Sequence, residues 1–327
     1  MIEALKRLGK LGKPAFSSKA RAPFILLEDG WGAVVGEEIV AVRPVEVSGG
    51  RACVGDDKFF SLLNRLSGEL EMKVEGEELI LKAGKSRASL PLLPDEVAEE
   101  VVALLEKWRK AGWRECRKEV LDGMKILTDA VSFSASAAGF LRSIHLSEQF
   151  MEVGDPACVV RLNIPTGMEA LIPGKMVDSL AVLVPDEWAE DEAWVGFKKG
   201  DELILIRRID IPYPDVDSIM EHFSSGRLLK VEATELDLAL SRAEAFSSIV
   251  EVELARRRMK IRAESTGRFE EVLSVEWRGG EQRFRLDGRV LRRLLKLDVE
   301  EIRVTERGLK MELRNGVALQ IFEEAVA

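Results

Sequence analysis

One arrangement of helix and strand patterns occurs three times in this chain, and such a repeat constrains the fold more than any single motif does. Each copy has an amphipathic helix pattern, a polar connector, an alternating apolar segment, a glycine turn and a second apolar segment. The glycine turns are at Gly76, Gly200 and Gly308. Equivalent helix positions are Leu62, Leu180 and Leu294, which are separated by 118 and 114 residues. The pattern predicts three tandem modules.

A second helix pattern repeats in step with the first. It precedes a strand-like segment in each copy, and its equivalent positions are Leu5, Met124 and Leu238, separated by 119 and 114 residues. Two independent markers thus indicate one period of about 115 residues. We expect an α+β fold in which each module packs two helices on antiparallel strands.

Prolines mark the module boundaries, because they interrupt regular structure. Pro91 and Pro94 close the first module, and Pro212 and Pro214 close the second. An additional helix is predicted after the first module from one apolar stripe, formed by Val97, Val101, Leu104, Leu105 and Trp108. The expected division is module I over 1–95, the additional helix and linker over 96–112, module II over 113–220 and module III over 221–327.

The composition is that of a folded protein, since 46% of the 327 residues are hydrophobic and 32% are charged, with a net charge of −9. No run of 18 apolar residues is present, so we expect no membrane-spanning helix and no membrane partner. The N-terminal segment is basic and amphipathic, but it lacks the apolar core and cleavage site of a secretory signal. These features favour a cytoplasmic protein.

Few residues offer metal or redox chemistry. Cys53, Cys116 and Cys158 are far apart and have no metal-ligand spacing, so we expect reduced cysteines and neither a metal nor another cofactor. The two histidines, His145 and His222, lie in no recognisable motif. Structural or surface roles are expected for both histidines.

The sequence also offers little for catalysis, and we expect no enzyme. The motifs GxGxxG, GxxxxGK(S/T) and HExxH are all absent. An enzyme stays as an alternative only through acidic side chains such as Asp155 or Asp215, and every acidic protein has such residues. No zinc-finger spacing or RNP signature is present, so any contact with DNA is expected at phosphates and independent of base sequence.

Four segments occur in a recognisable order. Residues 79–94 end a strand with Leu-Pro before a linker, 207–220 contain a Pro-Asp stretch, and 235–248 and 268–297 carry the helix and strand patterns of the third module. In this order they resemble the bacterial DNA polymerase III beta subunit, the ring-shaped sliding clamp. The resemblance covers nearly the whole chain and is strongest after Pro214.

The resemblance implies a head-to-tail homodimer in which six modules close a ring around duplex DNA. Helices would line the hole and strands would form the outer sheets. Such a clamp does no chemistry; it is a processivity factor that tethers a DNA polymerase by topology. The alternative is a clamp-like ring that serves a phage, plasmid or repair partner, because the additional helix and the C-terminal tail depart from the family pattern.

An acidic protein that encircles DNA is expected to gather positive charge on the helices that face the phosphates. Two helices fit this expectation, at residues 3–13 and 287–297, whereas in the helix at 235–247 acidic residues outnumber the one arginine. Four residues of the second helix are spaced to share one broad face. The predicted DNA-facing residues are Lys6, Arg7, Lys10, Lys13, Lys58, Arg65, Lys125, Lys175, Arg242, Arg289, Arg292, Arg293 and Lys296.

Two other basic segments are given structural interpretations. Residues 256–262 alternate like a strand, so a solvated outer sheet is expected there. Residues 108–118 mix tryptophan with basic side chains, which is compatible with stacking on single strands. Helical packing with lysine and arginine side chains that reach to solvent is the favoured interpretation of that segment.

The resemblance further implies a pocket for short apolar peptides of polymerase and clamp loader, and a dimer seam. Matched position by position, the pocket residues are Leu141, Val159, Ile321 and Phe322. The seam would bring Ala88 and Leu90 of the first module against Ala245 and Phe246 of the third module of the partner. The tail FEEAVA and the segment VGDPACV depart from the family pattern, so the peptide preference is expected to differ.

Overall fold

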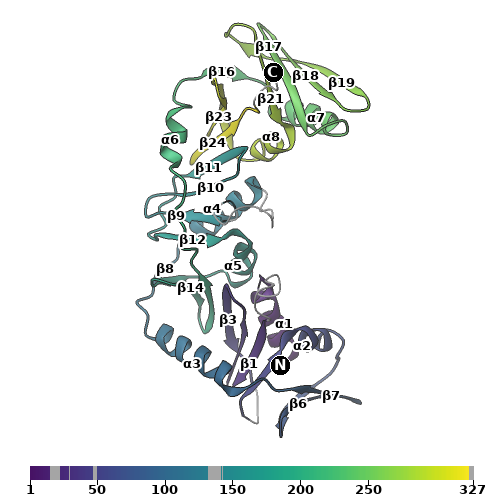
Figure 1. The fold of residues 1–327 in the computed structure, drawn as a ribbon, viewed down its shortest axis with the longest axis vertical. Coiled ribbons are helices and arrows are strands. Elements are labelled where there is room, and N and C mark those ends of the chain that lie inside the picture. The colour runs from purple at the N-terminus through teal and green to yellow at the C-terminus, as the bar shows by residue number, and fades with distance from the viewer. Residues whose placement is uncertain (15–22, 29, 47–49, 132–140, 142, 324–327) are drawn as a thin grey trace. The chain divides into compact units, whose positions relative to one another are not determined.

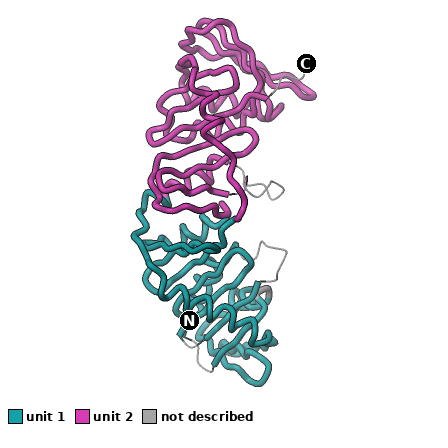
Figure 2. The backbone as a smooth tube through the Cα atoms, turned by 60° about the vertical axis from the view of Figure 1, so that its left-hand side comes forward, with its two compact units in different colours: residues 1–121, 175–209 teal, residues 122–174, 210–327 magenta. Residues whose placement is uncertain are grey.

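The computed structural model describes residues 1–14, 23–28, 30–46, 50–131, 141 and 143–323. The chain divides into two compact units, which Figure 2 colours separately. Unit 1 consists of residues 1–121 and 175–209, and unit 2 consists of residues 122–174 and 210–327. None of the described helices combines the length and hydropathy that a membrane span requires.

The described part of unit 1 is built on two antiparallel sheets (Figure 1). The eight-stranded sheet has the order β4-β1-β2-β3-β15-β14-β13-β8. Its strands are β1 (Phe24–Glu28), β2 (Trp31–Val35), β3 (Ile39–Pro44), β4 (Ala52–Gly55), β8 (Arg114–Glu115), β13 (Glu187–Glu190), β14 (Trp194–Lys199) and β15 (Glu202–Arg207). The three-stranded sheet comprises β5 (Leu70–Glu75), β6 (Glu78–Ala83) and β7 (Ser86–Pro91).

Helices cover both faces of the central strands in unit 1. These helices are α1 (Ile2–Leu11), α2 (Asp56–Leu63), α3 (Asp95–Arg109) and α5 (Val177–Leu183). Helix α1 packs on one face, where a Cβ on Gly32 would lie 3.2 Å from a methyl carbon of Leu8. Helix α3 packs on the other face in a cluster that contains Ala33, Val35 and Leu105. Strand segments buried on both faces are apolar, as the first four residues of β1 and of β3 are.

The described part of unit 2 also has two antiparallel sheets. The nine-stranded sheet has the order β12-β9-β10-β11-β24-β23-β22-β16-β20. Its strands are β9 (Ser143–Leu146), β10 (Met151–Gly154), β11 (Cys158–Leu162), β12 (Ala170–Pro173), β16 (Arg227–Lys230), β20 (Glu276–Trp277), β22 (Val299–Val304), β23 (Gly308–Leu313) and β24 (Gly316–Ile321).

The second sheet of unit 2 has the order β19-β18-β17-β21. Its strands are β17 (Ile249–Ala255), β18 (Arg258–Glu264), β19 (Arg268–Ser274) and β21 (Gln282–Asp287). The helices are α4 (Lys118–Ala130), most of which belongs to unit 2, α6 (Val216–Glu221), α7 (Ala233–Glu244) and α8 (Gly288–Leu294). Along β18 buried residues alternate with partly exposed ones, because only one face of this sheet meets helix α7.

Neighbouring copies of the repeat share sheets. In unit 1, β3 pairs with β15, so that Val42 lies opposite Leu203. In unit 2, β11 pairs with β24, so that Val159 lies opposite Leu319. The compact units therefore cut through the expected module II at residues 113–220, and the module boundaries stay a prediction.

The predicted helices are present at the predicted period. Helices α1, α4 and α7 begin at residues 2, 118 and 233, which are 116 and 115 residues apart. The additional helix is α3. The marker Leu238 lies in α7 but is 50% exposed, whereas its neighbours Leu236 and Leu240 are buried. Helix α6 was not predicted; it lies just after the prolines that were expected to close module II.

Candidate functional site

Helix α1 carries several of the predicted DNA-facing residues, and one of them, Arg7, is held by a carboxylate. Arg7 donates from Nε and Nη2 to both carboxylate oxygens of Glu202 on β15, at 2.8 to 3.2 Å. This hydrogen bonding raises the pKa of Arg7. Lys6 has one ion pair, 3.7 Å long, within its own helix. Lys10 and Lys13 are exposed, and within the described residues neither makes an ion pair.

The arginines of α8 point to different partners. Arg292 donates to Asp237 at 2.9 Å and to Glu244 at 2.6 Å, and both carboxylates belong to α7. Arg293 instead lies 3.9 Å from Asp155, in the connection between β10 and β11. The predicted common basic face is thus divided, because Arg292 meets two carboxylates of α7 and Arg293 meets Asp155. Its DNA-facing role stays a prediction.

Three further predicted cations form ion pairs. Lys175 pairs with Glu38, Arg242 with Glu271 and Arg289 with Asp287. Lys58 is exposed and belongs to α2. The predicted cations for which the described residues supply no ion pair are Lys10, Lys13, Arg65, Lys125 and Lys296. Within the predicted set, these five side chains carry charge that the described residues do not neutralise.

The basic run at 256–262 has the expected strand structure along β18. Arg262 donates to Glu270 at 3.0 Å and to Glu251 at 3.1 Å, and hydrogen bonding to Glu270 raises its pKa. Arg256 and Arg257 are exposed at the turn before the strand. The end of this run that lies within the sheet is therefore neutralised by acidic neighbours.

An apolar cluster joins β11, α6 and β24 in unit 2, and we call it the peptide cluster. Its buried members are Val159, Val216, Phe223, Val317 and Leu319, and its partly buried edge is formed by Tyr213, Ile219, Met220 and Ile321. Two residues predicted for the peptide pocket, Val159 and Ile321, thus belong to one cluster. A third residue, Leu141, is half-buried and lies outside this cluster as the structure describes it.

The fourth predicted pocket residue has a different environment. The ring of Phe322 stacks on Phe284 of β21, with centroids 4.1 Å apart and planes at 13°. Sequence reasoning missed Tyr213, Val216 and Phe223, although the apolar spacing through 216, 219, 220 and 223 is that of a helix face. That signal was present within the segment interpreted as a boundary.

A buried polar network supports the peptide cluster. Glu152 is 2% exposed, and it accepts hydrogen bonds from Arg161 at 2.7 Å and from the His145 ring at 2.8 Å. Arg161 also binds Asp217 of α6, and the ring of Tyr213 stacks on His145 with centroids 4.6 Å apart. Burial raises the pKa of Tyr213. The network fixes one end of α6 and the loop that precedes it.

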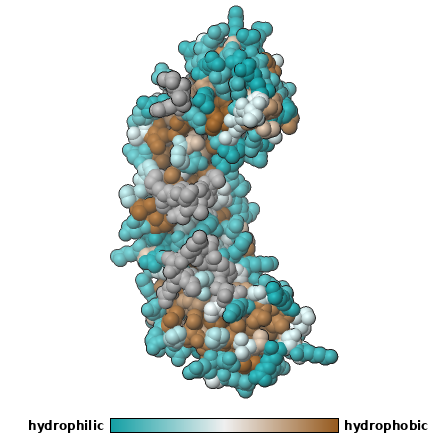
Figure 3. Space-filling model, turned by 45° about the vertical axis from the view of Figure 1, so that its right-hand side comes forward, coloured by the Kyte–Doolittle hydropathy of each residue, from teal (hydrophilic) through white to brown (hydrophobic). Residues whose placement is uncertain are grey.

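The predicted seam residues lie beside unpaired sheet edges. Strand β7, with half-buried Ala88 and buried Leu90, has only β6 as a neighbour, and β19 has only β18 among the described strands. Ala245 is exposed, and Phe246 is 37% exposed and lies 5.9 Å from Phe269 of β19. Figure 3 shows hydrophobic side chains gathered on the surface of unit 1.

The acidic residues that kept an enzyme as an alternative have structural roles. Asp155 accepts hydrogen bonds from the backbone N–H groups of Ala157 and Cys158, at 2.8 and 2.9 Å. Asp215 caps α6 by accepting the Ser218 N–H at 3.1 Å. Over the described ranges, no group of three or more His, Cys, Asp or Glu side chains is arranged to hold a metal ion.

The cysteines are free and buried, as expected for separate reduced thiols. Burial raises the pKa of Cys53 and of Cys116 to about 11. A thiol with such a pKa is protonated at neutral pH and therefore a poor nucleophile.

Of the comparisons with known proteins, the one with solved structures finds similar proteins. No protein-family model matches, and no curated protein sequence matches. Solved structures do match. The DNA polymerase III subunit beta from Pseudomonas aeruginosa is 17% identical with a TM-score of 0.80, covering 99% of this chain and 98% of that chain. The beta subunit from Thermotoga maritima is 16% identical with a TM-score of 0.78, covering 99% and 98%.

A third match is the Helicobacter pylori beta clamp bound to a DNA ligase peptide. It is 12% identical with a TM-score of 0.76, covering 98% of this chain and 97% of that chain. At these identities the likeness lies in the fold and extends over essentially the full length of each chain. The chain thus has, from one end to the other, the α+β fold of the bacterial DNA polymerase III beta subunit, the sliding clamp.

Proposed function

We propose that the protein is a DNA sliding clamp, a processivity factor that encircles duplex DNA in the cytoplasm and does no chemistry itself. One observation carries this proposal: 99% of the chain follows the fold of solved beta subunits. The three repeats predicted from the sequence would be the building units of such a ring. A ring needs no strong contact with DNA, because topology keeps it on the duplex.

The charge distribution supports a loose, sequence-independent contact. The net charge is −9, and Arg7 and Arg292 among the predicted DNA-facing residues are held by carboxylates. The available cations are the five unpaired side chains named above, which suffice for contacts with a few phosphates. Because no base-reading motif is present, these contacts would not depend on base sequence, and the ring would slide.

The partner across the seam is proposed to be a second copy in head-to-tail orientation. Two free edges support this assignment: β7 in unit 1 and β19 in unit 2, each at the end of its sheet. Antiparallel pairing of β7 with the partner's β19 would satisfy both edges. Val272, which is 53% exposed on β19, and Phe246 would then be covered.

The mass in solution tests this assembly. Light scattering is expected to give twice 36.4 kDa, about 73 kDa. Val272→Lys, which adds charge at the proposed seam, is expected to give a monomer. Val184→Lys changes a valine of similar exposure, 48%, that is far from either edge strand in the sequence, and it serves as the control. A monomer at all micromolar concentrations of the unmodified chain contradicts the proposal.

The peptide cluster is proposed to bind short apolar segments of a DNA polymerase and a clamp loader. Its partly buried edge offers Ile321, Met220 and Tyr213 around a buried floor. Among the similar structures, the Helicobacter pylori beta clamp is bound to a DNA ligase peptide, so a repair partner is the second candidate. Titration with polymerase-derived and ligase-derived peptides separates the two.

A further inference from the structure

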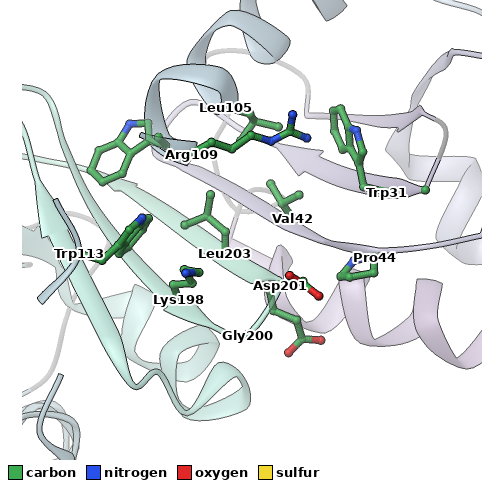
Figure 4. Close-up of a pocket in the computed structure, with 13 residues that line it drawn as sticks. Trp31, Val42, Pro44, Leu105, Arg109, Trp113, Lys198, Gly200, Asp201 and Leu203 are labelled. Atoms are coloured by element: carbon green, nitrogen blue, oxygen red, sulfur yellow. The ribbon is translucent and has the colours of Figure 1, made fainter. Parts of the chain in front are cut away.

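Unit 1 contains a pocket that neither the DNA contact nor the peptide cluster uses. It has a volume of about 520 Å³ and lies beside the C-terminal end of α3, on the sheet face that this helix covers. Figure 4 shows Val42 and Leu203 between two tryptophans, Trp31 and Trp113, at opposite ends. Pockets of about 300–1,000 Å³ hold compact ligands or one to two large side chains.

The wall of the pocket is preformed. Trp108, at the end of α3, is 2% exposed, and its ring occupies the space where Gly196 of β14 has no side chain. A Cβ on that glycine would lie 2.5 Å from the indole ring. This contact holds the end of α3 against the sheet, so a ligand meets an ordered wall, which lowers the entropic cost of binding.

The pocket repeats the construction of the peptide cluster. In unit 2 the cluster lies over the pair Val159 and Leu319, where two copies of the repeat join their strands, and α6 covers it. In unit 1 the pocket lies over the pair Val42 and Leu203, at the corresponding join, and α3 is its wall. An apolar, half-covered strand pair suits the same kind of occupant in both places, namely an apolar peptide side chain.

The charges at the rim select among occupants. Lys198 pairs with Glu187, and Glu202 pairs with Arg7, so both are already neutralised. Arg109 and Asp201 are exposed, and the described part of the chain provides an ion pair for neither. Figure 4 shows them on opposite sides of the pocket.

The free charges at the rim therefore comprise one cation and one anion. A nucleic-acid strand carries only negative charge and would be repelled at Asp201. A peptide with an acidic residue at one end and a basic residue at the other matches both rim charges. Tryptophan and arginine, which both line the pocket, are also residue types that often dominate binding energy at protein interfaces.

We propose that this pocket, which we call the α3 pocket, docks a short segment of a partner protein. The segment has one or two large apolar side chains between an acidic residue next to Arg109 and a basic residue next to Asp201. This site goes beyond the proposed clamp function, because the peptides considered there bind in unit 2. It gives the additional helix a role: α3 builds a second docking site.

Peptide titration followed by the tryptophan indole N–H signals tests the proposal. The titrated protein carries Ile321→Asp, which prevents peptide binding at the peptide cluster in unit 2. The probe is the pentapeptide ELFGK with both termini chemically blocked. Saturable shifts are expected for the signals of Trp31 and Trp113. ELFGK is expected to bind about fivefold more tightly than ELFGE or KLFGK, since one unmatched charge at an exposed rim costs about 1 kcal/mol.

A change of preference distinguishes docking from a general loss of structure. Arg109→Glu leaves two negative charges at the rim, so the preferred peptide is expected to become KLFGK. Lys110→Glu changes a neighbouring exposed lysine that does not line the pocket, and it should leave the preference for ELFGK unchanged. The proposal is overturned by absent or non-saturable shifts, by equal affinities for all three peptides, or by the same shifts with oligothymidylate.

Discussion

Arg292 of α8 lies between two carboxylates of α7, with its Nε 2.9 Å from Asp237 and its Nη1 2.6 Å from Glu244. The side chain is 24% exposed, and the hydrogen bond to Asp237 raises its pKa. A guanidinium held in this way fastens one helix to the other, and it presents little free charge to a DNA phosphate.

Removing this guanidinium should therefore reduce stability more than DNA binding. Arg292→Ala leaves two carboxylates close together without their cation, and we expect the free energy of unfolding to fall by about 1–2 kcal/mol. Urea denaturation measures this change. Arg289→Ala, at a more exposed arginine of the same helix, should change it by less than about 0.5 kcal/mol. Equal effects of the two substitutions contradict the assigned roles.

DNA affinity should depend instead on the unpaired lysines. Replacing Lys10, Lys13 and Lys296 by glutamate should weaken binding to a duplex. The salt dependence should also become shallower, since each lost phosphate contact removes about 0.9 from the slope of log K against log salt. Fluorescence anisotropy with a labelled duplex measures both quantities. Arg256→Glu, at an exposed arginine outside the predicted set, is the control; a drop of the same size there would rule out a specific DNA face.

Peptide binding in unit 2 should distinguish two adjacent residues of the C-terminal strand region. Ile321 borders the peptide cluster, so Ile321→Asp should abolish binding of a polymerase-derived peptide. Phe322 stacks on Phe284, so Phe322→Ala should lower stability yet change the Kd by less than about threefold. Isothermal titration calorimetry measures the Kd. The reverse order of effects would mean that the peptide binds on the Phe284 side.

The buried thiols make unit 1 sensitive to alkaline pH. The pKa of Cys53 and of Cys116 is about 11 in the folded chain, whereas an unfolded thiol has a pKa of about 8.5. The folded state keeps these protons while the unfolded state loses them, so their contribution is complete below about pH 8.5 and is lost as pH rises towards 11. On the order of 3 kcal/mol per thiol is at stake.

Urea titrations from pH 7 to 10.5 measure that loss. A chain with Cys53→Ala and Cys116→Ala starts less stable, because two buried side chains are smaller, but it should lose less stability over this interval. If both chains lose the same free energy of unfolding between pH 7 and 10.5, the thiols titrate alike in the folded and unfolded states. That result would contradict the prediction.

Much of the fold follows from periodicity alone. Seven helix patterns, including that of α3, were recognisable because apolar residues recur at helical spacing, and the glycine turns between strands were equally plain. The alignment of copies was less exact. Leu238 was matched to Leu5 as an equivalent position, but Leu5 is buried and Leu238 is 50% exposed, while α7 buries Leu236 and Leu240. A helix face shifts by 100° per residue, so a small error in alignment exchanges core and surface.

The candidate site was predictable only in part. Val159 and Ile321 were assigned to the pocket by resemblance, and the structure brings them into one cluster. Helical spacing predicted that Arg292 and Arg293 share a face, yet the carboxylates that bind them come from residues 55 and more than 130 positions away. Such partners depend on tertiary packing, which spacing along one helix does not contain.

The central claim is that two copies enclose duplex DNA, and topology tests it most directly. Ser89→Cys on β7 and Val272→Cys on β19 would be joined by a bis-maleimide in the presence of nicked circular plasmid, while the native cysteines are buried. The account predicts that the crosslinked protein stays on the circle in 1 M salt, where charge contacts are screened, and leaves once the plasmid is cut. Loss from the intact circle, or retention on the linear plasmid, would contradict it.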